Sequence, residues 1–210
     1  QTNAGSYTIT ATLSSGYRWS DNATGTKTFT CSISKATPTI TLSATSGTVV
    51  AGKTMTFTAT VKSGASGGSV SGTLAASSGT TSVATVSPTS TTISSANNST
   101  GKVTTETVTG VADGSSTITV NFTPTDTANY NNATAKTYTA TVAKSATIPT
   151  NSLCKCTGLT TCGSSYSSFA YTGSAQTLTT ATSGTGYTLS GYSQTNAGSY
   201  TITATLSSGY

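Results

Sequence analysis

Apolar residues and threonines alternate strictly along several stretches of the chain. Residues 55–61 read Met-Thr-Phe-Thr-Ala-Thr-Val, and residues 117–122, 137–142 and 200–206 follow the same period of two. Because successive side chains of a β-strand point to opposite faces, each stretch puts its apolar residues on one face and its threonines on the other. The pattern predicts antiparallel strands in sheets with one buried face. No stretch keeps a helical apolar period, so we expect an all-β protein.

Clusters of Gly, Asn, Asp and Ser separate these stretches and predict turns between short strands. They occur at residues 63–68, 95–99, 112–114 and 129–132. Short strands with regularly spaced turns are typical of seven-strand immunoglobulin-like sandwiches. We therefore expect tandem immunoglobulin-like β-sandwiches.

The first seventeen residues of the chain recur without change at its end. Residues 1–17 and 194–210 both read QTNAGSYTITATLSSGY, 193 positions apart. A match of this length does not arise by chance, so the sequence is interpreted as a window on a tandem array. The repeat would be about 193 residues long, and the window would open and close inside a unit.

Two different modules fit within one such repeat. Module A is expected at 36–146, and residues 147–151 are expected to form a linker in which Pro149 discourages strand pairing. Module B would begin at 152, continue to 210 and finish with the next copy of 18–35. Residues 1–35 would then be the C-terminal part of the preceding module B. Alone they would expose strand edges, so we expect a neighbouring copy to complete them.

The composition narrows the class of protein. Hydrophobic residues make up 33% of the chain and charged residues 6%, which suits an ordered protein with a thin core better than a disordered one. The net charge of +5 comes without a basic run, so we expect no nucleic-acid partner. No stretch approaches the roughly 20 apolar residues of a membrane helix, so we expect no membrane insertion in this window. A signal peptide or an anchor outside the window is compatible with this expectation.

Catalytic chemistry has few candidate residues in this sequence. There is no His and there are only four acids, so neither a catalytic triad nor a carboxylate pair is evident. No Asp cluster offers the oxygen ligands that calcium requires. We expect no enzyme activity, no cofactor and no metal. A Lys–Asn isopeptide cross-link beside a buried acid is a further hypothesis, with these candidates: Lys53, Lys62, Lys102, Lys136, Lys144, Glu106, Asp113 and Asp126.

Four cysteines are the strongest candidates for covalent chemistry: Cys31, Cys154, Cys156 and Cys162. An even number of cysteines in a thin-cored module predicts two disulfides if the module is secreted, and the C-x-C-x5-C spacing without His lacks a zinc pattern. Three connectivities are open. We favour one disulfide between Cys31, on the last strand of module B, and Cys154 of the preceding repeat. The second disulfide would join Cys156 to Cys162.

Two aromatic residues lie close together in sequence, Tyr17 and the only tryptophan, Trp19. Exposed aromatic rings of this kind contact sugars in lectins, whereas a lone tryptophan in a sandwich more commonly packs in the core. Both interpretations stay open. The outward faces of Thr and Ser are a candidate surface for O-glycosylation, which would supply solubility where charge is scarce.

Several segments resemble known bacterial modules. Module A resembles the bacterial immunoglobulin-like (Big) domains. The segments that carry the resemblance are 47–54, 57–61, the glycine-rich stretch at 110–120, and 122–130. Residues 171–176, 196–206 and 16–21 are similar to a related module of large bacterial surface proteins. The resemblance implies a spacer or adhesion role on a cell surface, with no catalytic residues to transfer.

These observations predict a structural, non-enzymatic extracellular fibre or stalk on a bacterial cell surface. Its partner would be itself, through covalent tandem repeats and lateral contacts between fibres. The alternative is an adhesin or carbohydrate-binding repeat that recognises a host glycan or protein through Tyr17 and Trp19.

Overall fold

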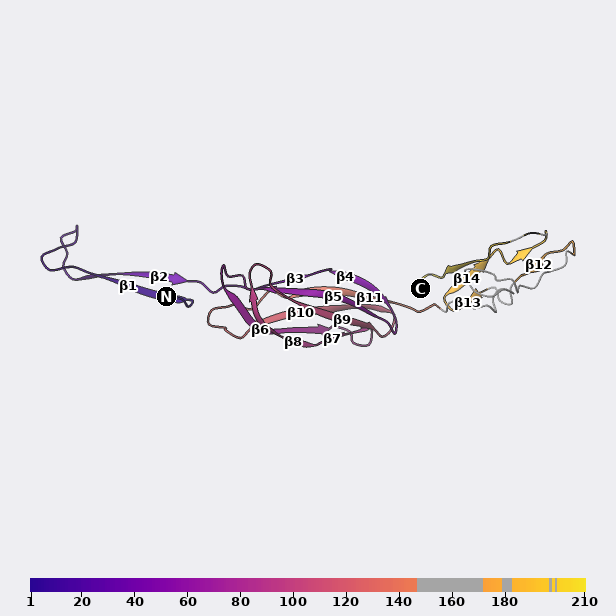
Figure 1. The fold of residues 1–210 in the computed structure, drawn as a ribbon, viewed down its shortest axis with the longest axis horizontal. Helices are drawn as coiled ribbons and strands as arrows, with labels where there is room; N and C mark the ends of the chain where they lie inside the picture. The colour runs from indigo at the N-terminus through magenta and orange to yellow at the C-terminus, as the bar shows by residue number, and fades with distance from the viewer. Residues whose placement is uncertain (147–171, 179–182, 197, 199) are drawn as a thin grey trace.

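The computed structural model describes residues 1–146, 172–178, 183–196, 198 and 200–210. Figure 1 shows a two-stranded hairpin at one end, a two-sheet sandwich in the middle and a set of short strands at the other end. Every regular element of these residues is a β-strand, which confirms the all-β class.

Two sheets face each other in the central sandwich. One sheet has five strands in the order β4 (Ser46–Val50), β11 (Lys136–Ala143), β10 (Gly114–Pro124), β6 (Ser69–Ser78) and β8 (Ser90–Asn97). The other has four, in the order β3 (Thr39–Leu42), β5 (Thr54–Lys62), β9 (Lys102–Gly110) and β7 (Ala84–Ser87). Neighbouring strands are antiparallel except β4 and β11, which run parallel with Ser46 opposite Thr139 and Val50 opposite Ala143.

The alternation read from the sequence decides which side chains are buried. In β10 the side chains of Ile118, Val120 and Phe122 are buried, whereas the alternate residues Thr117 and Asn121 are exposed and Thr119 is half-buried. The same pattern repeats in β5 and β11. The predicted half-buried strands at 55–61, 117–122 and 137–142 are therefore confirmed.

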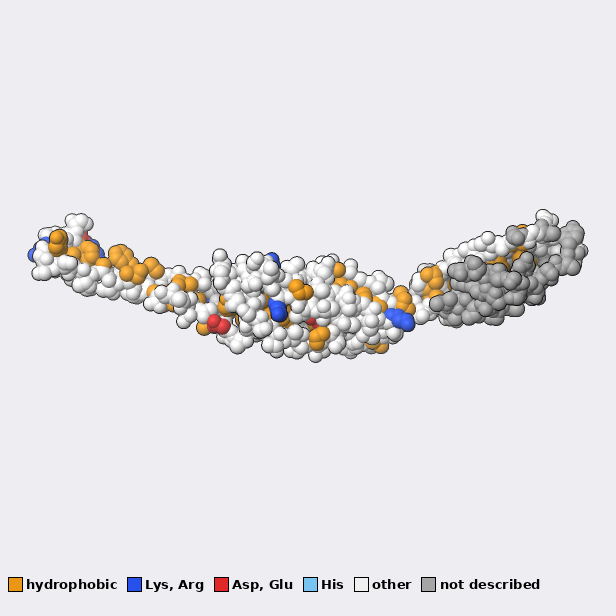
Figure 2. All heavy atoms as spheres, viewed as in Figure 1, with side chains coloured by type: hydrophobic (Ala, Val, Ile, Leu, Met, Phe, Trp, Pro, Cys, Tyr) orange, Lys and Arg blue, Asp and Glu red, His pale blue; other side chains and the backbone are white. Residues whose placement is uncertain are grey.

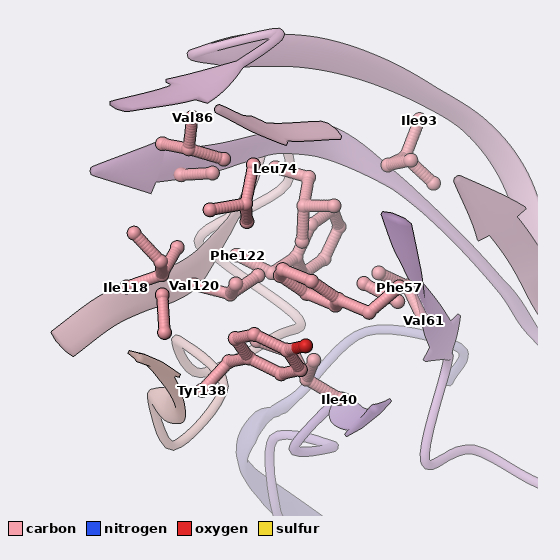
Figure 3. Packing of buried hydrophobic residues seen from close by; sticks show 14 of the residues in the cluster. Ile40, Phe57, Val61, Leu74, Val86, Ile93, Ile118, Val120, Phe122 and Tyr138 are labelled. Atoms are coloured by element: carbon pink, nitrogen blue, oxygen red, sulfur yellow. The ribbon is translucent and has the colours of Figure 1, made fainter. Parts of the chain in front are cut away.

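Apolar side chains from both sheets interdigitate to form the core (Figure 3). The rings of Phe57 and Tyr138 stack across the sandwich with their centroids 4.3 Å apart and their planes 12° from parallel. Phe122 and Leu74 are each 1% exposed. Burying a side chain of this size stabilises the fold by about 1.5–3 kcal/mol, so a few large residues support a chain that is otherwise poor in them.

The sandwich has nine strands, two more than the seven expected from the sequence. Two of the strands without a predicted alternation, β7 and β8, are built largely from Ser, Thr and Ala. Their apolar signal is weak, and residues 95–99 were expected to form a turn, whereas β8 continues to Asn97. Between β6 and β8 the register shifts at Val70 and Gly72, where a Cβ on Gly72 would lie 2.2 Å from the Thr123 carbonyl oxygen.

Outside the sandwich the sheets are small. At the N-terminus, β1 (Gly5–Thr12) pairs with β2 (Thr26–Ile33) and with no other strand among the described residues. At the C-terminus, β12 (Gln176–Thr177) pairs with β15 (Ser193–Gln194), and β13 (Ser183–Gly184), β14 (Tyr187–Ser190) and β16 (Thr203–Leu206) form a three-stranded sheet in that order. The strand expected at 200–206 is thus observed over its second half. The expected linker at 147–151 and the expected start of module B at 152 lie outside the described residues.

Candidate functional site

The N-terminal hairpin has one apolar face and one threonine face. The β1–β2 register places Tyr7 opposite Cys31, Ile9 opposite Phe29 and Ala11 opposite Lys27. Because directly opposed residues of antiparallel strands point to the same face, these apolar side chains gather on one side, where Figure 2 shows hydrophobic atoms along the hairpin. Ile9 is 54% exposed and Phe29 56% exposed, so this face is not covered.

Cys31 lies in the middle of that apolar face. Its side chain is exposed, and it has no disulfide partner among the described residues. Cys154, Cys156 and Cys162 lie outside the described residues. The two disulfides, and the pairing of Cys31 with Cys154 of a preceding repeat, therefore stay predictions.

Trp19 lies in the loop that joins β1 to β2 and is held there by local contacts. Its ring nitrogen Nε1 donates to the Gly25 carbonyl oxygen at 3.0 Å, and Lys27 Nζ lies 5.6 Å from the ring centroid. Lys27 also pairs with Asp21, and this hydrogen bond lowers the pKa of the Asp21 carboxyl. Sequence reasoning missed this arrangement, although the short spacing between Trp19, Asp21 and Lys27 could have indicated that the three side chains meet in one loop.

Tyr17 behaves differently from Trp19. Its side chain is 72% exposed, whereas Trp19 is half-buried. Its backbone N–H donates to the Ser14 carbonyl oxygen at 3.2 Å, which closes a turn. Of the two predicted aromatic contacts, Tyr17 is therefore the one with a ring available to a partner.

A network of hydrogen bonds joins the hairpin to the end of the sandwich. The Ala4 N–H donates to Asn129 Oδ1 at 2.7 Å, and Asn129 Nδ2 donates to Asp126 Oδ2 at 2.7 Å. Lys35 Nζ donates to the Thr127 carbonyl oxygen at 2.7 Å. The Ala36 N–H donates to the Asn129 carbonyl oxygen at 2.9 Å. We call residues 126–131 and their contacts with 3–4 and 35–37 the junction.

The junction depends on the loop between β10 and β11. Asp126 Oδ1 accepts from the backbone N–H groups of Ala128 and Asn129, both at 3.1 Å, so its carboxylate fixes the loop as a turn. The hydrogen bonds from the Asn129 side chain and backbone hold the pKa of Asp126 below its ordinary value. Asp126 was considered only as a cross-linking acid from the sequence, so its structural role was missed.

Glu106 is a charged residue inside the sandwich. It lies on β9 opposite Phe57 and is 1% exposed. Thr104 Oγ1 donates to Glu106 Oε1 at 3.2 Å, whereas Oε2 has no hydrogen-bond partner among the described residues. Burial raises the pKa of this carboxyl, opposed by the Thr104 hydrogen bond, because removal from water penalises the charged form.

The structure does not bring Glu106 together with the candidate lysines. Four of them are exposed and Lys62 is half-buried. Of the other two candidate acids, Asp113 lies 3.9 Å from Lys144 Nζ at the surface and Asp126 belongs to the junction. Within the part of the chain that the structure describes, none of the five candidate lysines is therefore buried with Glu106.

Two negative findings apply to the described residues alone. Among them, no group of three or more His, Cys, Asp or Glu side chains is close enough to hold a metal ion. Within the same ranges, no helix is long and apolar enough to cross a membrane.

Comparisons with known proteins give distant structural likenesses. No family model matches the chain, and no curated protein matches it. A structure of domains 1–6 of the surface layer protein SbsC is similar at 24% identity and a TM-score of 0.38 over 70% of this chain, which spans 17% of that chain. SbsC domains 4 and 5 are similar at 28% identity and a TM-score of 0.35, over 55% of this chain and 58% of that one. WR4, an MSP family member of C. elegans, is similar at 9% identity and a TM-score of 0.38, over 50% of this chain and 97% of that one.

Proposed function

We propose that this chain is a structural, non-enzymatic segment of an extracellular fibre or stalk built from tandem immunoglobulin-like repeats on a bacterial cell surface. The observation that carries the proposal is the exact recurrence of residues 1–17 at 194–210, on either side of one closed sandwich. Proteins built from stacked repeats gain length and valency by adding units, and each unit contacts only its neighbours.

The placement of the two ends supports this proposal. The hairpin β1–β2 and the short strands β12–β16 lie at opposite ends of the sandwich (Figure 1). A contact that joins the head of one unit to the tail of the next generates an open filament unless the rotation closes a ring. Units of this shape would therefore extend along one direction.

The junction supports a stiff connection between consecutive modules. Asn129 holds the backbone at Ala4, and Lys35 holds the loop at Thr127. These contacts fix the hairpin against the sandwich from both of its chain ends. A spacer benefits from this restriction, because free hinges between modules would shorten its reach.

Cell-surface labelling tests the location directly. An antibody against the sandwich should label intact bacteria as strongly as permeabilised ones, and brief protease treatment of intact cells should remove the signal. A cytosolic protein serves as the control for membrane integrity. Labelling that requires permeabilisation would contradict the proposal.

An adhesin that binds a glycan or protein is the second candidate, favoured by the exposed ring of Tyr17. It predicts that the purified chain binds a glycan array or host cells, and that Tyr17→Ala removes this binding. Thr117→Ala, a change at an exposed position of β10, is the matched control. Equal binding by both variants would exclude Tyr17 from recognition.

A further inference from the structure

The same seventeen residues occur in two settings and keep two local contacts in both. In the first copy Tyr7 Oη donates to the Asn3 carbonyl oxygen, and in the second Tyr200 Oη donates to the Asn196 carbonyl oxygen. The turn at the end is also the same, with an N–H···O distance of 3.2 Å from Tyr17 to Ser14 and from Tyr210 to Ser207. The two copies therefore share the tyrosine hydrogen bond and the closing turn, whereas their strands differ in extent: β1 covers Gly5–Thr12, and β16 covers Thr203–Leu206, which is equivalent to residues 10–13.

The two copies pair with different strands. In the first copy, β1 pairs with β2 and has no second partner among the described residues. In the second copy, β16 pairs with β14 and forms the edge of its sheet within the same ranges. A strand has two edges, so one strand of this sequence has room for both partners.

We infer that β2 of one copy of the sequence completes the sheet that ends with β16 of the preceding copy. The completed sheet would have the order β13–β14–β16–β2. The occupant of the β16 edge is thus a second copy of Thr26–Ile33, which follows the repeated segment in sequence. This inference deepens the proposed function and rests on it for the existence of consecutive repeats.

The two registers combine into one consistent sheet. Ala11 lies opposite Lys27, and its equivalent Ala204 lies opposite Leu189. Thr10 lies opposite Thr28, and its equivalent Thr203 lies opposite Ser190. The rows through Ser190 and Thr188 hold only Ser and Thr, and the row between them joins Leu189 and Ala204 to Lys27, which lies at the end of the apolar face. A register slip of one residue would mix the two faces.

The combined sheet also unites apolar side chains that are now separate. Tyr187 and Leu189 of β14 share a face with Leu206 of β16, and that face continues through the equivalents of Ile9 to Phe29. Leu206 is 61% exposed, and Ile9 and Phe29 are more than half exposed. A continuous sheet gives these side chains a common surface on which a facing sheet can pack.

Tyr17 and Tyr210, the last residues of the two copies, differ in exposure, and this difference indicates what a completed sheet would cover. Tyr210 packs on the turn between β13 and β14, where a Cβ on Gly186 would lie 2.3 Å from its ring. Tyr17, with the same sequence before it, is 72% exposed, whereas Tyr210 is only partly exposed. In the completed sheet, the β13–β14 turn of the preceding copy would cover Tyr17 as the turn at Gly186 covers Tyr210.

The contacts of Tyr210 also give the direction of the array. Lys144, just after β11, places its Nζ 5.7 Å from the ring centroid of Tyr210. The loop that begins at Tyr17 would accordingly lie against the end of the preceding sandwich. The junction lies at the other end of the same hairpin and contacts the following sandwich. The completed module would thus lie between two sandwiches in a head-to-tail array.

An extended chain tests this inference. A copy of residues 18–35 is added after Tyr210, and hydrogen exchange is compared with the original chain under reducing conditions. Peptides that begin within β14 distinguish residues 203–206 from the identical residues near the N-terminus. We expect exchange at 203–206 to slow about tenfold or more, because each 1.4 kcal/mol of protection corresponds to tenfold.

The control extension has the same composition and the wrong pattern. In the control extension, three pairs of neighbouring residues swap places: Thr28 with Phe29, Thr30 with Cys31, and Ser32 with Ile33. The swaps move the apolar side chains to the face that the threonines occupied. Slower exchange with the correct extension alone would support the inference. Equal exchange in the two extended chains, or no slowing with the correct one, would overturn it. Surface labelling of cells is independent of this result, so a failure here is distinguishable from a failure of the proposed stalk.

Discussion

The central sandwich and the N-terminal hairpin are built from the same kind of strand but differ in what their apolar face meets. In β10, Ile118 and Phe122 are at most 1% exposed, because a second sheet covers them. In the hairpin, Ile9 and Phe29 have the same alternation and are more than half exposed. Alternation specifies which side chains share a face, whereas burial requires a second sheet.

This difference shows where the stability of the chain resides. A two-stranded hairpin is at best marginally stable in water, while a sheet with a packed face is stable. The hairpin is instead held by its junction with the sandwich and by the contacts around Trp19. Substitutions in the core, at the buried carboxyl, in the junction and in the hairpin loop would separate these contributions.

The largest difference is expected between two phenylalanine substitutions. Phe122→Ala removes a buried ring from the core and should lower the free energy of unfolding of the sandwich by about 3–5 kcal/mol. Phe29→Ala, in the exposed hairpin face, should change it by less than about 0.5 kcal/mol. Urea unfolding followed by circular dichroism measures both. Comparable losses would mean that the hairpin is packed as the sandwich is.

The second effect concerns the buried carboxyl. Glu106→Gln replaces the ionisable carboxyl with a neutral amide, and we expect this variant to be more stable than the original chain at pH 7 by about 1–3 kcal/mol, because the amide avoids the cost of burying a charge. The difference depends on pH. Because burial raises the pKa of Glu106, its penalty is absent below the ordinary value of 4.5 and appears as pH rises through and above that value.

Thermal or urea unfolding from pH 4 to pH 8 measures this difference. The two proteins should converge at the acidic end and diverge towards neutral pH. A constant difference across the range would show that Glu106 does not change its protonation on unfolding.

A smaller effect is expected at the junction. Asn129→Ala removes the acceptor for the Ala4 N–H and the donor to Asp126, a loss of about 1–2 kcal/mol for hydrogen bonds of this kind. Distances between spin labels on β1 and on the sandwich should spread more widely, measured in a background without native cysteines. Asn121→Ala, on the exposed face of β10, is the matched control and should leave the distribution unchanged.

The smallest effect is expected in the hairpin loop. Lys27→Met removes the cation over the Trp19 ring and the partner of Asp21. The unfolding midpoint of the sandwich should not change, since the loop lies outside its core, but the fluorescence emission of Trp19 should shift. An unchanged emission spectrum would indicate that Lys27 does not lie over the ring in solution.

The sequence predicts the sandwich strands well where the pattern is dense and poorly where it is sparse. The alternation at 55–61, 117–122 and 137–142 carries large apolar residues, and each stretch is a strand. In β7 and β8 the buried positions include Ala84 and Ala96, which are 0% exposed. Alanine occurs as readily in turns and exposed positions, so the pattern did not reveal these strands.

The candidate site was less predictable, because it depends on contacts between distant residues. Cys31 and Tyr17 could be singled out by residue type, but the meeting of Asn129 with Ala4 joins positions 125 residues apart. Likewise, the different partners of β1 and β16 follow from pairing, since their local sequences are identical. Sequence patterns report local geometry and leave such pairings open.

The parallel pairing of β4 with β11 has a mechanical consequence. Pulling on the two chain ends of the sandwich draws β4 towards its first residue and β11 towards its last, in opposite directions along a shared ladder from Ser46–Thr139 to Val50–Ala143. The hydrogen bonds of this ladder are then loaded together in shear, whereas in a hairpin pulled open from its ends they would break in succession. β4 is the second strand of the sandwich and β11 is its last, so this ladder joins strands close to opposite ends of the module's sequence, where it would carry an extending load.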